Sequence, residues 1–109
     1  MLETLERLLG HSTEADDALR ATVELLVAEP GIVWAGIAFL EEGSLVLGPA
    51  AGSEDLSRRV HAPIVYRDEP VGELWVDGDS ELTLLARVAE LVAPHVLVGW
   101  DTGGERWEA

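Results

Sequence analysis

The chain has 109 residues, a formal net charge of −14 at pH 7 and no cysteine. This length fits a single domain, and a hydrophobic content of 48% predicts that it folds around one core. The negative charge argues against binding to nucleic acid or anionic lipid, and the lack of cysteine excludes disulfides, thiolate metal sites and thiol nucleophiles.

The N-terminal segment has leucines at helical spacing and no basic stretch ahead of an apolar run, so it is not expected to be a secretory signal. We predict a helix and turn over residues 1–12. A second helix follows and should end at the turn sequence 29–31. No apolar stretch approaches the roughly 20 residues that a membrane span needs. We therefore expect a cytoplasmic protein with no membrane contact.

The middle of the chain predicts a first hairpin. Residues 32–40 form a near-continuous apolar run that is typical of a buried strand. A short loop leads to a returning strand over 45–47, and residues 48–52 are expected to be flexible because they are small and rich in glycine. Residues 53–59 can form a single helical turn.

A second hairpin is predicted from strands at 60–66 and 71–77. The last helix should cover 81–99, with a kink or break at Pro94 because proline lacks the amide that a helix interior needs. Residues 101–109 are expected to be a flexible tail. This order of elements predicts an α+β fold, in which an antiparallel sheet carries the N- and C-terminal helices on one face, as in PAS and profilin-like domains.

The second hairpin carries a more specific pattern. Ala62-Pro63-Ile64 and Val71-Gly72-Glu73-Leu74 resemble the paired strands of GAF domains, and the resemblance extends over about residues 13–100. It implies a sensory, signalling or protein-interaction role. A roadblock-type regulatory domain has a similar order of elements and stays an alternative, although it would need a longer helix than residues 53–59 allow.

The resemblance also implies where a small ligand would bind, on the sheet face away from the main helices. The segment available to cover that face is short, so any pocket should be reduced. The candidate ligand-binding residues are Trp75, Glu73, His61, Trp34, Arg58 and Arg59. For the two arginines, local ion pairs with Glu54 and Asp55 are the competing interpretation.

Members of the GAF family that reduce free methionine sulfoxide work through cysteine, which this chain lacks. None of the three histidines has a second metal ligand at a recognised spacing, and there is no serine-nucleophile or phosphate-loop motif. From these observations we predict that the domain is not an enzyme and has neither a metal nor a cofactor.

The terminal helices suggest a partner. GAF domains often assemble through their first and last helices, and the last helix here is apolar over more than one stripe. Residues 2–9 add leucines that need apolar contacts. An exposed apolar surface on a small domain usually marks an interface. We therefore predict a homodimer formed through the N- and C-terminal helices.

Overall fold

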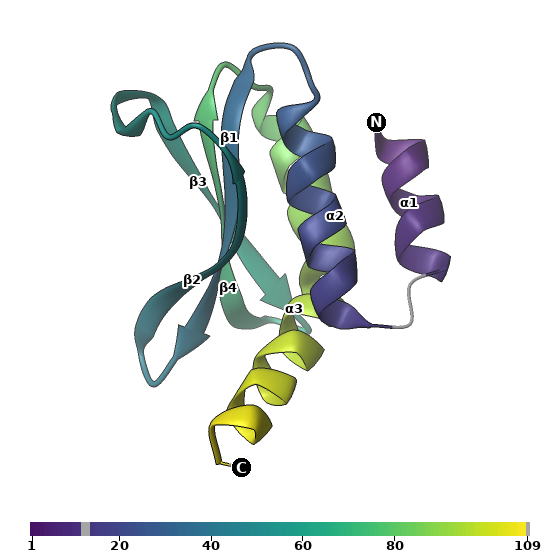
Figure 1. Ribbon diagram of the computed structural model, residues 1–109, viewed down its shortest axis with the longest axis vertical. Helices are drawn as coiled ribbons and strands as arrows, with labels where there is room; N and C mark the ends of the chain where they lie inside the picture. Colours follow the sequence, from purple (N-terminus) through teal and green to yellow (C-terminus); the bar gives the residue numbers. More distant parts are fainter. Residues whose placement is uncertain (12–13, 109) are drawn as a thin grey trace.

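A four-stranded antiparallel sheet in the order β2-β1-β4-β3 forms one layer of the protein (Figure 1). The computed structural model describes the backbone of residues 1–11 and 14–108 and the side chains of residues 1–11 and 14–97. The strands are β1 (Ile32–Glu41), β2 (Ser44–Gly52), β3 (Arg59–Tyr66) and β4 (Glu69–Gly78). The α+β class, with helices on one face of an antiparallel sheet, is confirmed.

Two helices cover one face of the sheet, and a third packs on their outer side (Figure 1). The helices are α1 (Leu2–His11), α2 (Ala15–Val27) and α3 (Leu82–Glu108), and a short 3-10 turn, η1 (Leu56–Arg58), joins the two hairpins. Residue 12, the end of the predicted N-terminal turn, lies outside the described residues. In the part of the chain that is described, no helix is both long enough and apolar enough to cross a membrane.

The hydrophobic core lies between the sheet and the helices. Strand alternation directs Ala35 and Ile37 of β1 and Leu74 and Val76 of β4 into it. Helix α1 contributes to the same core, since Leu5 is fully buried. The leucines of residues 2–9, for which we expected an apolar partner, are thus largely satisfied within the chain.

Strand β2 is longer than predicted. Residues 48–52, expected to be flexible, continue β2 to Gly52, where Gly52 pairs with Trp34 and Ala51 with Ala35. Glycine and alanine favour strands weakly, but the central strand β1 supplies backbone partners for residues 50–52, and this tertiary pairing outweighs local preference.

Helix α3 also extends further than predicted. It passes through Pro94 and runs to Glu108, so residues 101–108, expected to be a flexible tail, are helical; residue 109 lies outside the described part. Each residue added to an existing helix gains a hydrogen bond without a new nucleation cost, which offsets the roughly 1 kcal/mol penalty of each glycine in the extension. The final turns of α3 project beyond the sheet (Figure 1).

Candidate functional site

The sheet face opposite the helices, here called the open face, collects five of the six predicted ligand-binding residues. Trp34 comes from β1, Arg59 and His61 from β3, and Glu73 and Trp75 from β4. Strand register explains the clustering, because His61 pairs with Trp75, and Trp75 pairs with Gly36 two residues beyond Trp34.

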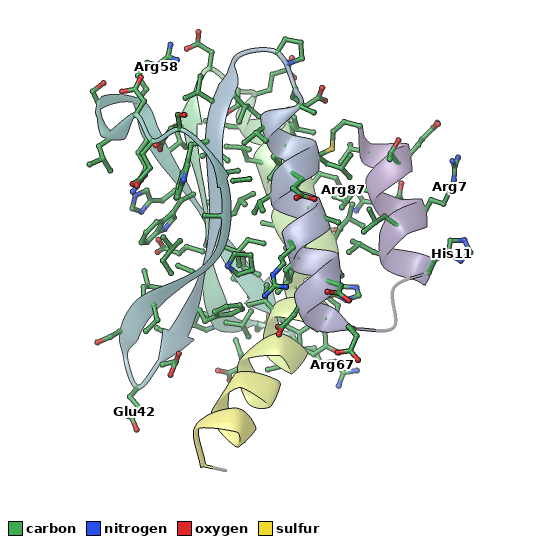
Figure 2. All side chains as sticks on the ribbon, viewed as in Figure 1. Arg7, His11, Glu42, Arg58, Arg67 and Arg87 are labelled. Carbon is green, nitrogen blue, oxygen red and sulfur yellow. The ribbon has the colours of Figure 1, made fainter. Side chains whose placement is uncertain are left out.

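The sixth residue, Arg58, lies apart from this cluster. It belongs to η1 at the end of the sheet (Figure 2). Its Nε donates to Asp55 Oδ2 at 3.0 Å, and its side chain is 44% exposed. The ion pair expected as the alternative to ligand binding is therefore formed at this position.

Arg59 is held by a buried carboxylate. Its Nε and Nη2 donate to the two oxygens of Asp77 at 2.7 and 3.0 Å, and Nη2 also donates to Glu54 at 3.1 Å. The Asp77 side chain is fully buried, whereas that of Arg59 is 13% exposed. The hydrogen bonds that the guanidinium donates to Asp77 hold the pKa of Asp77 below its usual range and raise the pKa of Arg59.

Asp77 also fixes the segment that crosses the end of the open face. Its Oδ2 accepts a hydrogen bond from the backbone amide of Asp55 at 2.7 Å. The Ser57 hydroxyl donates to the Asp55 carboxylate at 2.7 Å and, together with Arg58, lowers the pKa of that group. One buried carboxylate thus joins β3, β4 and the connection between the two hairpins.

The guanidinium of Arg59 also covers the aromatic part of the open face. Its Cζ lies 4.2 Å from the ring centroid of Trp34 and 5.5 Å from that of Trp75, within cation–π distance. Trp34 is only 4% exposed. Much of the expected pocket is therefore filled by the chain's own side chains.

The indole of Trp34 can lie flat on the sheet because residue 36 is glycine. A Cβ atom at Gly36 would come within 2.6 Å of the Trp34 ring. Leu47 of β2 borders the same space. The glycine in this apolar strand is thus explained by close approach of a side chain.

The part of the open face around Glu73 is accessible and polar. Glu73 Oε1 accepts a hydrogen bond from Trp75 Nε1 at 2.8 Å and lies 3.1 Å from His61 Nδ1. The imidazole stacks on Trp75 with ring centroids 5.0 Å apart. Glu73 is 30% exposed and His61 51% exposed. In the described structure, Glu73 Oε2 and His61 Nε2 make no hydrogen bond.

Sequence reasoning missed the central role of Asp77. A signal was present in the second hairpin. Pairing residues outward from its turn, with Tyr66 opposite Glu69, brings His61 and Arg59 within one residue of Trp75 and Asp77. What could not be foreseen is the bulge between Ile64 and Val65, which shifts the register by one residue and sets His61 opposite Trp75 and Arg59 opposite Asp77.

Comparisons with known proteins bear on the fold. No family model matches the chain, and no curated protein matches it. The GAF domain of a phosphoenolpyruvate-protein phosphotransferase from Acinetobacter is 14% identical, covering 92% of this chain and 94% of its own, with a TM-score of 0.72. A GAF sensor protein from Burkholderia vietnamiensis is 15% identical, covering 95% of this chain and 88% of its own, with a TM-score of 0.64.

Enzymes have the same fold. The free methionine-R-sulfoxide reductase of Neisseria meningitidis is 15% identical, covering 93% of this chain and 89% of its own, with a TM-score of 0.71. Our prediction that the domain is not an enzyme is therefore corrected, because reductases and sensors share this architecture. Any chemistry here would use groups other than cysteine, and the contact between Glu73 and His61 is a carboxylate–imidazole pair that sequence reasoning did not detect.

The connection between the hairpins discriminates between a GAF-like fold and a roadblock-type fold. It contains only the three-residue η1, whereas a roadblock-type domain would need a long helix there. The sheet order, the helices on one face and the similarity to solved GAF domains agree. The chain has a GAF-like fold.

Proposed function

We propose that this domain is a sensory or regulatory module that binds a small molecule on its open face. The observation that carries the proposal is the arrangement around Glu73. One carboxylate oxygen contacts Trp75 and His61, the other has no hydrogen-bond partner among the described residues, and the side chain is 30% exposed. Binding sites typically combine apolar walls with a few convergent polar groups, as here.

The charges favour a ligand that donates hydrogen bonds. Arg59 is already neutralised by Asp77 and Glu54, so it is a weak candidate for holding an anion. Glu73 offers a carboxylate beside the flat ring of Trp75, and the chain's net charge of −14 attracts cations. We therefore propose an amine or another nitrogen donor that carries a flat apolar group.

Replacing Trp75 by alanine or Glu73 by glutamine should weaken binding of an arylalkylamine such as phenethylamine by about tenfold. The first change removes the stacking surface and the second removes the negative charge. Titration followed by tryptophan fluorescence or calorimetry measures the effect. Glu24→Gln, on the exposed side of α2, is the matched control and should bind as the wild type does.

Native mass spectrometry of the purified protein provides an independent test, because a co-purified ligand would add mass that disappears on denaturation. Unchanged amine binding by both open-face variants would contradict the placement of the site. If Glu24→Gln weakened amine binding equally, the interaction would depend on the net charge of the protein and not on the open face.

We further propose that the domain is a homodimer formed through the outward surfaces of α1 and α3. The supporting observation is that α3 continues past the sheet, where no other element covers its backbone (Figure 1). We expect sedimentation at micromolar concentration to give twice the chain mass of 11.8 kDa. Amide exchange in α3 should slow as concentration rises, and a strict monomer would contradict this proposal.

A further inference from the structure

Strand β2 leaves an apolar edge uncovered. The sheet order places it at the outside of the sheet, where one side of its backbone has no neighbouring strand (Figure 1). Three consecutive residues of this edge are exposed, with Leu45 at 38%, Val46 at 46% and Leu47 at 44%. Proteins usually protect such edges with charges, prolines or bulges, because free backbone groups beside apolar side chains recruit other strands.

Only the second half of β2 has that protection. Gly36 pairs with Ala50 and Ala38 with Leu47, so β2 carries an extra residue between these pairs and forms a bulge there. Pro49 lies in the bulge and has no amide hydrogen to donate. Helix α2 packs against this half, where its Val27 lies beside Gly52. The unprotected edge is therefore the segment 44–48.

The charged residues nearest to this segment in the sequence are acidic. Residues 30–57 contain four acidic residues and no lysine or arginine. Glu41 and Glu42 flank the start of β2, and Glu42 lies at the tip of the hairpin (Figure 2). The acidic residues beyond the other end of β2, Glu54 and Asp55, are paired with Arg59 and Arg58.

We propose that the edge 44–48 binds an extended segment of another protein by strand addition, and that this segment has an apolar centre and basic residues toward the hairpin end. Backbone hydrogen bonds would supply affinity, as in other β-augmented complexes. Leu47 lies opposite Ala38 and borders Gly36, so the apolar side chains of the partner would extend the open face. A second copy of this chain is the poorer occupant of this edge, because its own segment 44–48 contains no basic residue to pair with Glu41 and Glu42.

The test uses a capped synthetic peptide of about six residues, the usual length of a strand, with alternating valine and threonine and an arginine at each end. On titration into the isotopically labelled full chain, amide exchange at residues 44–48 should slow. Leu45→Lys and Leu47→Lys should each weaken binding by about tenfold, because the new charge faces the basic peptide. Glu42→Gln should weaken binding less and reduce its dependence on salt.

Leu82→Lys is the matched control, since Leu82 is 69% exposed at the start of α3 and is not part of this edge. It should bind the peptide as the wild type does. A peptide in which glutamate replaces arginine should not bind. No protection at 44–48 at millimolar peptide, or protection confined to β3, would overturn the proposal. So would a dimer of the chain that Leu47→Lys dissociates, because that result assigns the edge to a second copy.

Discussion

Replacing Asp77 by alanine should lower the free energy of unfolding by about 3 kcal/mol, because removing one partner of a buried ion pair leaves the other partner uncompensated. Asp77 is fully buried, and its oxygens accept from the Arg59 side chain and the Asp55 backbone amide. Arg59 keeps Glu54 and some solvent contact, which limits the loss. Chemical denaturation followed by circular dichroism measures it.

Asp79 provides the matched control two residues further along the chain. Its side chain is 88% exposed and forms an ion pair with Arg58 at 3.8 Å. Exposed pairs of this kind contribute little, so Asp79→Ala should change stability by less than about 0.5 kcal/mol. Equal losses for the two variants would contradict the central role of Asp77 in joining β3, β4 and the connection between the hairpins.

Asp77→Ala should also change how the stability of the protein depends on acidic pH. The pKa of Asp77 is lowered in the folded protein, while an aspartate in the unfolded chain titrates near about 3.9. Its stabilising contribution is therefore complete above about pH 5 and is lost as the pH falls through the folded-state pKa. Asp77→Ala should flatten this acid limb in denaturation midpoints measured from pH 7 to pH 3. The lowered pKa of Asp55 contributes in the same range and should remain in part.

His95 acts in a separate range of pH. Burial lowers its pKa, so the unfolded chain takes up a proton more readily, and stability falls as the pH drops below about 6.5, its ordinary value. This contribution is independent of Asp77. Repeating the series with His95→Gln separates the two effects.

Replacing Trp34 by alanine should lower the free energy of unfolding by about 4 kcal/mol, within the usual range for truncating a large buried aromatic side chain. The indole is 4% exposed and fills the surface above Gly36. Its loss also deprives Arg59 of its closer aromatic contact, at 4.2 Å. Because small domains have only about 5–15 kcal/mol of stability in total, the variant should unfold at much lower denaturant concentration.

Val33 is the control for this experiment, since it precedes Trp34 in the same strand and is 38% exposed. Val33→Ala should cost less than about 1.5 kcal/mol. If Trp34→Ala lowered the free energy of unfolding as little as Val33→Ala does, solvent could replace the indole. The open face would then contain a larger pocket than the burial of Trp34 indicates.

The sequence alone determined the class of fold and most of its elements. Alternation placed Leu74 and Val76 under the helices and Glu73 and Trp75 on the other face, because a strand has a period of two. The sequence pattern of the second hairpin indicated a GAF-like fold. The sequence also identified five residues that lie together on the open face, although which of them are cross-strand neighbours depends on the bulge between Ile64 and Val65.

Tertiary structure decided what local preference could not. Residues 48–52 belong to strand β2 because β1 pairs with its end. Helix α1 packs on its own chain because Leu5 is buried in the core. Asp77 became the centre of the site because folding buried it beside Arg59, and the energy of such a pair depends on burial that no sequence pattern records. Whether Trp34 would line a pocket or fill it likewise depended on the position of one guanidinium in three dimensions.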